Sequence, residues 1–249
     1  NLTGDAADAV AAQVAKLDEI RQTVVATSQV PLDVNDPVAV TAEGTPVRIV
    51  RNAETNLGDL CADAYRALSN ADIAFVNGGG IRKQIEAGDI TLDDIYSVHP
   101  FGNTMCVIRV TGQQVLDALE WGARAVPSEN GGFLQVSGLT YEIHTGVASS
   151  AEKDENGMFT RVSGEYRVKN VMVGGQPLEL DKTYTLASHN YMLLGHGDGY
   201  TMFDGCEVLG EDMMVDNQVL ITYITTTLGG VVGEQYANPY GDGRIVAVE

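Results

Sequence analysis

The sequence lacks long hydrophobic runs. No segment approaches the roughly 20 apolar residues that a membrane-spanning helix needs, and the longest candidate, residues 219–228, is interrupted by threonine and tyrosine. A signal-peptide pattern is absent at the start, where the chain opens with Asn1 instead of methionine. We therefore expect no membrane insertion within this chain, a processed or engineered start, and targeting information that is missing from this sequence.

Basic residues are also scarce. The 249 residues include 15 Lys and Arg against 34 Asp and Glu, which gives a net charge of −19. Because phosphate backbones bind clustered Lys and Arg, this balance excludes a nucleic acid polymer as the partner. The balance is compatible with an exported protein. A small anionic ligand would need a local basic site within this negative field.

Cysteine patterns of the metal-binding or disulfide-rich kind are missing. The three cysteines, Cys61, Cys106 and Cys206, are odd in number, match no zinc spacing and stand among apolar neighbours. We interpret them as small buried residues.

Catalytic histidine patterns are missing as well. The four histidines form no H-x-H or H-E-x-x-H pair, and neither a D-x-H start nor a G-D-x-x-x-G turn of a two-metal phosphoesterase occurs. Ser188 and His189 are adjacent, but neighbours on a strand point to opposite faces. We therefore predict no catalytic residue and no metal site in this chain, and we interpret His189 as a structural strand residue.

Helical and strand patterns alternate without a strict βαβ rhythm. Apolar spacing predicts helices at 5–23, 54–69, 90–98, 111–123 and 218–227. Buried or alternating strands are predicted at 37–42, 47–50, 72–76, 105–110, 134–144, 165–173, 183–188 and 244–248. Such a mixture predicts an α+β class with mixed sheets.

A glycine-rich turn directly follows the buried strand at 72–76. Residues 77–82 read Asn-Gly-Gly-Gly-Ile-Arg. Three glycines permit positive φ and close backbone approach, and their N–H groups can line an anion pocket. Arg82 adds a charged planar fork suited to phosphate, and Asn77 can both donate and accept. The alternative is a tight turn with a surface Arg.

Two further loops contain polar or aromatic residues between glycine or proline. Asp198 lies in the Gly-His-Gly-Asp-Gly-Tyr run at 195–200, where its carboxylate can accept two bonds from a ribose diol. A plain turn is the alternative there, since nearby carboxylates are too few for calcium. Phe101 lies in His-Pro-Phe-Gly-Asn at 99–103, and an exposed aromatic on such a loop can stack on a base. Its alternative role is to fill the core.

These motifs, taken in order, resemble the C-terminal domain of the 5′-nucleotidase family, which includes ecto-5′-nucleotidase, UDP-sugar hydrolases and 2′,3′-cyclic-nucleotide 2′-phosphodiesterases. The ordered motifs are Glu-Thr-Asn-Leu-Gly at 54–58, the turn at 77–82, Pro-Phe-Gly-Asn at 100–103, Val-Ser-Gly at 136–138 and Gly-Asp-Gly-Tyr at 197–200. The resemblance covers the chain from Val47 onward. It implies a layered α/β/β/α domain at 37–249, with residues 1–36 as a linker helix from a missing N-terminal metallophosphoesterase domain.

The resemblance also implies roles for individual residues. Asn77 and Arg82 would contact phosphate and sugar, Phe101 would form one face of a base clamp, and Asp198 would bind the ribose hydroxyls. Ala53 replaces an Arg that family members often have, so Arg51 takes over part of the phosphate contact. The second clamp aromatic falls at Met192, with Tyr191 beside it, and either side chain can pack on a base.

The resemblance therefore implies a substrate-recognition domain of a secreted, periplasmic or cell-surface nucleotide phosphohydrolase that acts in nucleotide catabolism. The partners would be a nucleotide or nucleoside and the chain's own N-terminal domain, which would contain the two divalent metal ions. This chain has no cofactor of its own and is predicted inactive alone. Still open are a 5′-nucleotide, a cyclic nucleotide or a UDP-sugar as substrate, and a non-catalytic interaction module.

Overall fold

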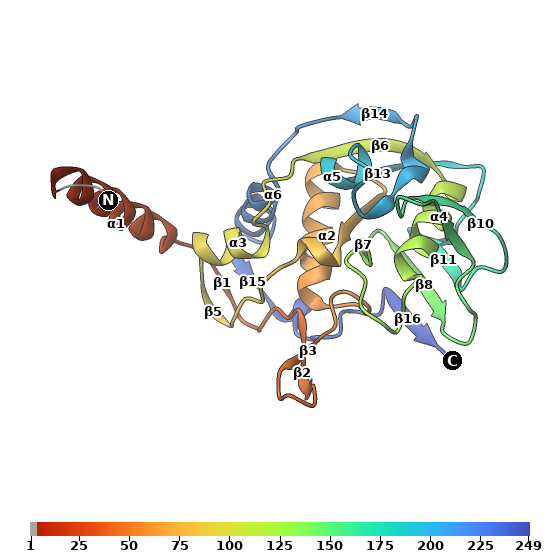
Figure 1. Cartoon of the computed structure of the whole chain (residues 1–249), viewed down its shortest axis with the longest axis horizontal. Helices are drawn as coiled ribbons and strands as arrows, with labels where there is room; N and C mark the ends of the chain where they lie inside the picture. Colours follow the sequence, from red (N-terminus) through yellow and green to blue (C-terminus); the bar gives the residue numbers. More distant parts are fainter. Residues whose placement is uncertain (1–3) are drawn as a thin grey trace.

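The centre of the computed structural model, which describes residues 4–249, is a five-stranded sheet in the order β14-β6-β13-β4-β7 (Figure 1). β13 runs parallel to β4, and the other neighbours are antiparallel. The strands are β4 (Ile73–Asn77), β6 (Met105–Thr111), β7 (Leu134–Ser137), β13 (Thr183–His189) and β14 (Glu207–Gly210).

Strand β4 is buried on both faces, which explains its unbroken apolar run. Ile73 and Phe75 belong to one hydrophobic core, whereas Ala74 and Val76 belong to the other, as the two-residue period of a strand requires. The core around Val76 includes residues of α2 (Asn56–Ser69), α3 (Leu92–Val98) and α6 (Asp216–Thr222). The core around Phe75 includes α4 (Gly112–Ala123) and a second sheet.

The remaining strands of the described part of the chain form four smaller sheets. The second large sheet has the order β12-β11-β8-β16, and a three-stranded sheet has the order β15-β1-β5. Their bounds are β8 (Leu139–His144), β11 (Val168–Val173), β12 (Gln176–Pro177), β16 (Ile245–Val248), β1 (Val24–Ser28), β5 (Gly88–Thr91) and β15 (Val231–Val232). Two hairpins pair β2 (Asn35–Val40) with β3 (Pro46–Arg48) and β9 (Ala151–Lys153) with β10 (Phe159–Val162). The predicted α+β class with mixed sheets is confirmed.

Helix ends follow the capping residues in the sequence. The Thr55 side chain accepts from the Gly58 N–H at the start of α2, and Asn70 ends this helix in the left-handed conformation. α4 begins with a capping box of Thr111 and Gln114. These caps fix the residues at which α2 begins and ends and at which α4 begins.

The predicted linker segment divides into a helix and a part that joins the sheets. Helix α1 (Gly4–Arg21) projects from the body of the molecule (Figure 1). β1 pairs with β5 and β15, and residues such as Leu32 and Val34 are buried in the core. Residues 1–3 of the predicted linker lie outside the described residues.

Several predicted elements differ from the structure in their extent. The strand expected at 134–144 is interrupted at Gly138, whose φ of +83° turns the chain from β7 into β8. The helix expected at 90–98 begins only at Leu92, because the preceding residues pair as β5. The helix expected at 218–227 is α6 followed by a π-helical turn, Tyr223–Thr227. Between residues 4 and 249, no helix combines the length and hydropathy that crossing a membrane requires.

Candidate functional site

A cavity of about 350 Å³ opens where β4 ends. Loops that are far apart in the sequence meet there, because β4, β6 and β13 are neighbours in the central sheet. The lining includes six of the seven predicted site residues, one further polar side chain and three glycines: Arg51, Asn77, Arg82, Phe101, Tyr191, Asp198, Asn103, Gly79, Gly80 and Gly131.

The glycines after β4 serve close packing. The N–H groups of Gly78 and Gly79 donate to Phe133 and Gly131 backbone oxygens at 2.7 and 2.8 Å, so they do not point freely into an anion pocket as expected. None of the three glycines at 78–80 lies in the left-handed region. A Cβ on Gly78 would overlap the carbonyl oxygen of Val50, and a Cβ on Gly80 would lie 2.6 Å from Asn77 Oδ1. Absence of side chains therefore lets the turn pack closely around Asn77.

Asp198 is held at the cavity wall by several donors. Its backbone is left-handed, with φ of 54°. Asn77 Nδ2 donates to Asp198 Oδ2 at 2.6 Å, and the Trp121 indole N–H donates to the Asp198 carbonyl at 2.9 Å. The Tyr191 hydroxyl donates to Asp198 Oδ1 at 3.3 Å and accepts from the Asp198 N–H at 3.2 Å. The carboxylate is thus fixed before any ligand binds.

The two aromatic side chains of the predicted clamp, Phe101 and Tyr191, are both exposed at the cavity. Phe101 is 60% exposed and Tyr191 is 43% exposed, which is unusual for large rings and leaves their faces available. Both line the cavity. Met192 is fully buried in the core, because its position on the short helix α5 (Asn190–Leu193) is rotated by about 100° from that of Tyr191. The structure therefore places Tyr191 and not Met192 at the cavity.

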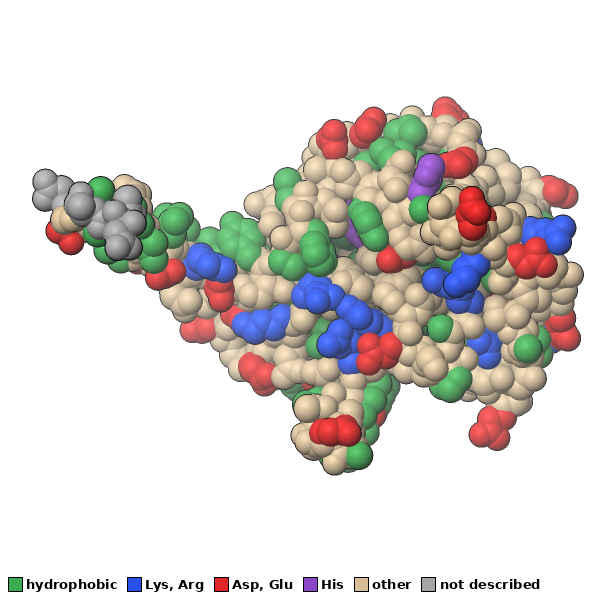
Figure 2. Space-filling view, in the orientation of Figure 1, with side chains coloured by type: hydrophobic (Ala, Val, Ile, Leu, Met, Phe, Trp, Pro, Cys, Tyr) green, Lys and Arg blue, Asp and Glu red, His purple; other side chains and the backbone are tan. Residues whose placement is uncertain are grey.

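The cavity has a positive rim despite the acidic composition. Figure 2 shows Lys and Arg side chains gathered in the middle of the visible face, above the β2–β3 hairpin. Arg51 is half-buried, and burial together with the nearby Arg48 and Arg82 lowers its pKa. The Arg82 guanidinium lies 5.9 Å from the Phe101 ring centroid and donates to the Gly79 carbonyl at 3.3 Å. Converging cations of this kind favour an anion between them.

Asn103 lines the cavity but was not assigned a role from the sequence. It ends the same Pro-Phe-Gly-Asn motif as Phe101, so its place in the motif was the available signal. Its backbone is anchored by Asp216, since Asn103 N–H donates to Asp216 Oδ2 at 3.2 Å and Asp216 N–H donates to the Asn103 carbonyl at 2.8 Å. This pair fixes the end of the Phe101 loop.

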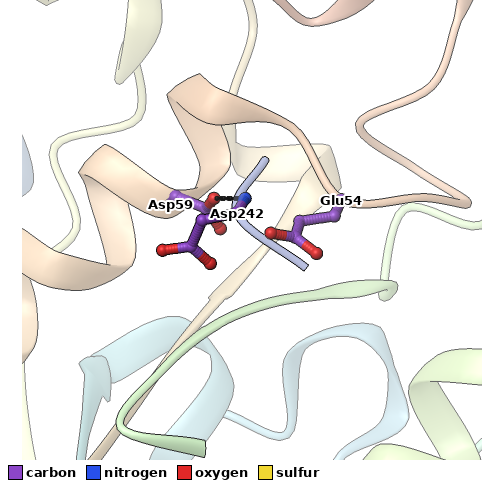
Figure 3. Close-up of side chains that lie close together, drawn as sticks. All are labelled: Glu54, Asp59 and Asp242. Carbon is purple, nitrogen blue, oxygen red and sulfur yellow. Dashed lines mark hydrogen bonds between the residues drawn. The ribbon is translucent and has the colours of Figure 1, made fainter. Parts of the chain in front are cut away.

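One acidic group, Glu54, Asp59 and Asp242, brings its oxygen atoms within 4.8 Å of one another (Figure 3). Glu54 accepts from the backbone N–H groups of Gly243 and Ile245 at 3.0 and 2.7 Å. Asp59 accepts from the Asp242 N–H at 3.2 Å.

Arg244 supplies the positive charge in this acidic group. Its Nε lies 2.9 Å from Asp242 Oδ1 and 3.6 Å from Asp59 Oδ1. Burial raises the pKa of Asp59 to about 9, so its carboxyl holds a proton near neutral pH. Because Arg244 already pairs with these carboxylates, a divalent metal does not fit among them, and the group instead attaches the C-terminal strand to α2.

Comparisons with known proteins identify the family of this chain. A family model described as "5′-nucleotidase, C-terminal domain" matches residues 24–205. The trifunctional nucleotide phosphoesterase protein YfkN of Bacillus subtilis is 36% identical over 203 residues, which are 80% of this chain and 13% of that protein. A 5′-nucleotidase of Vibrio cholerae is 34% identical over 176 residues, which are 71% of this chain and 28% of that protein.

A solved structure is similar over nearly the whole chain. The crystal structure of the 5′-nucleotidase precursor from Thermus thermophilus matches with a TM-score of 0.76 and 30% identity, covering 98% of this chain and 43% of that one. This chain thus spans less than half the length of each of these proteins. It belongs to the family of 5′-nucleotidase C-terminal domains.

Proposed function

We propose that this chain is the nucleotide-recognising domain of a secreted nucleotide phosphohydrolase. The observation that supports this best is the convergence of two exposed aromatic rings, two arginines and a fixed carboxylate on one cavity, although they come from separate loops. The family and the names of the relatives supply the class of substrate.

Each group has a role that its chemistry suits. The base stacks between Phe101 and Tyr191, where an aromatic contact contributes about 1–3 kcal/mol per base. Asp198 accepts hydrogen bonds from the ribose hydroxyls. Arg51 and Arg82 attract the phosphate, and a hydrogen bond to such a charged group contributes about 1.5–3 kcal/mol.

Hydrolysis itself is assigned to a separate N-terminal metallophosphoesterase domain with two divalent metal ions. The residues of this chain bind and orient the nucleotide, and the acidic group at Glu54 does not fit a metal. α1 supports a contact with such a domain, because its apolar residues Val10, Val14, Leu17 and Ile20 are 47–58% exposed. We expect the protein to lie outside the cytoplasm. Its reaction would belong to nucleotide catabolism.

Calorimetric titration of this chain with AMP and adenosine tests the proposal. We expect weak binding of both, and Phe101→Ala should weaken both by about 5- to 140-fold through loss of one stacking contact. Tyr96→Ala is the matched control, since Tyr96 is an exposed aromatic outside the cavity lining. Absence of heat with either ligand at high concentration would refute nucleotide recognition.

Two further assays separate the remaining alternatives. Titrating a 2′,3′-cyclic nucleotide and a UDP-sugar beside AMP ranks the substrate classes. A phosphatase assay with Mn²⁺ tests whether hydrolysis needs a separate domain, because robust turnover by this chain alone would contradict a separate catalytic domain. An interaction module with a vestigial cavity would bind none of the ligands.

A further inference from the structure

His189 is a buried residue whose ring contacts the cavity residue Asn77. It is the last residue of β13, is 3% exposed, and places Nε2 2.9 Å from Asn77 Oδ1. The same Asn77 side chain donates from its other end to Asp198 at 2.6 Å. A continuous series of hydrogen bonds therefore joins the core to the Asp198 carboxylate at the cavity.

The chemistry of the carboxylate fixes the donor and the acceptor in both hydrogen bonds, from His189 to Asn77 and from Asn77 to Asp198. An ionised carboxylate only accepts, so the amide must present its NH₂ group to Asp198. The amide oxygen of Asn77 then faces His189 and requires a donor, which places the imidazole proton on Nε2. Burial, followed by the neighbouring His99, lowers the pKa of His189 to about 4, which keeps the ring neutral near pH 7.

The surroundings leave this ring little freedom. The Tyr65 ring meets it edge-on at a centroid distance of 6.4 Å, and the tilted Tyr191 ring lies at 5.9 Å. Among residues 4–249, Nδ1 of His189 has no hydrogen-bond partner, so the Nε2 bond is the polar contact that the ring makes there through its nitrogens. Gly80 leaves room for the amide, since a Cβ there would lie 2.6 Å from Asn77 Oδ1.

We propose that His189 is a positioning residue for nucleotide binding, which orients the Asn77 amide and thereby holds Asp198 ready for the ribose hydroxyls. This inference rests on the proposed function. Without the His189 donor, the amide can turn by half a rotation and present its oxygen to Asp198. Two acceptors would then repel each other, and the carboxylate would leave the position in which it meets a diol.

The test compares two replacements of His189 by titration with adenosine and 2′-deoxyadenosine. His189→Phe keeps an aromatic ring without a donor, and His189→Gln restores an N–H donor at similar reach. The first should weaken adenosine binding by roughly 3- to 10-fold, as expected for one lost neutral hydrogen bond, and should reduce the preference for adenosine over the deoxynucleoside. The second should keep both within about twofold. His144→Gln is the matched control, because His144 pairs with Glu142 outside the cavity.

Two measurements distinguish positioning from a merely structural role. In an Asn77→Ala background, His189→Phe should cause no further loss of adenosine affinity, and an equal loss there would overturn the proposal. Nitrogen-15 NMR should show the proton on Nε2 of His189, whereas a proton on Nδ1 would overturn it.

Failure of this proposal differs from failure of the proposed function. If the unmodified chain binds no nucleoside, nucleotide recognition is refuted and the role of His189 falls with it. If the unmodified chain prefers adenosine and His189→Phe keeps the same preference while lowering only the melting temperature, then the positioning role alone is refuted.

Discussion

Gly197→Ala tests the position of the Tyr191 ring more specifically than removal of the ring. A Cβ on Gly197 would overlap the ring carbons Cε1, Cδ1 and Cζ of Tyr191, so the methyl group must displace the ring. Gly197 does not lie in the left-handed region, and alanine is therefore not strained there. Because Tyr191 is 43% exposed, its ring can turn toward solvent with little loss of stability.

We expect Gly197→Ala to weaken the binding of ligands that have a base. One base–aromatic stack contributes about 1–3 kcal/mol, which corresponds to an increase in Kd of about 5- to 140-fold for adenosine. Ribose 5-phosphate has no base, so calorimetry should show a smaller loss for that ligand. Gly146→Ala is the matched control, since a Cβ there has no atom closer than 4.0 Å. An unchanged Kd for adenosine in Gly197→Ala would refute the assignment of Tyr191 to the base clamp.

Two other predictions concern charge. Arg51→Ala and Arg82→Ala should each weaken AMP binding by about 10- to 140-fold through loss of a charge-assisted bond and leave adenosine binding unchanged. Arg109→Ala, at an exposed pair with Glu207, is the control, and equal losses for both ligands would contradict a phosphate contact. Burial raises the pKa of Asp59 from 3.8 to about 9, so the folded state keeps a proton that the unfolded state releases between these values, and stability falls as the pH rises through this window. Asp59→Asn should remove this slope and stabilise the fold by roughly 2–4 kcal/mol near pH 7, with no gain near pH 4, as measured by denaturant unfolding; parallel pH profiles for the two proteins would contradict the buried proton.

The central strand and its glycine-rich turn could be predicted from sequence because their causes are local. An apolar run with no polar interruption indicates burial on both faces, and β4 has this property. The packing contacts that require glycine in this turn could not be predicted in the same way. Gly78 packs against Val50 and Gly79 against Gly131, and such contacts between distant parts of the chain depend on the tertiary fold.

The choice between Tyr191 and Met192 shows the same limit at the level of one residue. Both side chains can pack on a base, and they are adjacent, so composition and spacing do not separate them. The two side chains point in different directions because the segment forms one helical turn. This turn begins directly after β13, which ends at His189. Short strands such as β1 and β15 were not predicted for a similar reason, since each is defined by a partner far along the sequence.

A chain with a net charge of −19 can still attract a phosphate, because electrostatic interactions at physiological salt are local. The Debye length is about 8 Å under these conditions, so exposed acids beyond this distance are largely screened. Burial of Arg51, followed by repulsion from the nearby Arg48 and Arg82, lowers the pKa of its guanidinium. A phosphate between the arginines would relieve that repulsion at the same time as it gains their attraction. The acidic surface would then act mainly against polyanions, whose many charges extend beyond the cavity, and would leave a single nucleotide as the anion that fits.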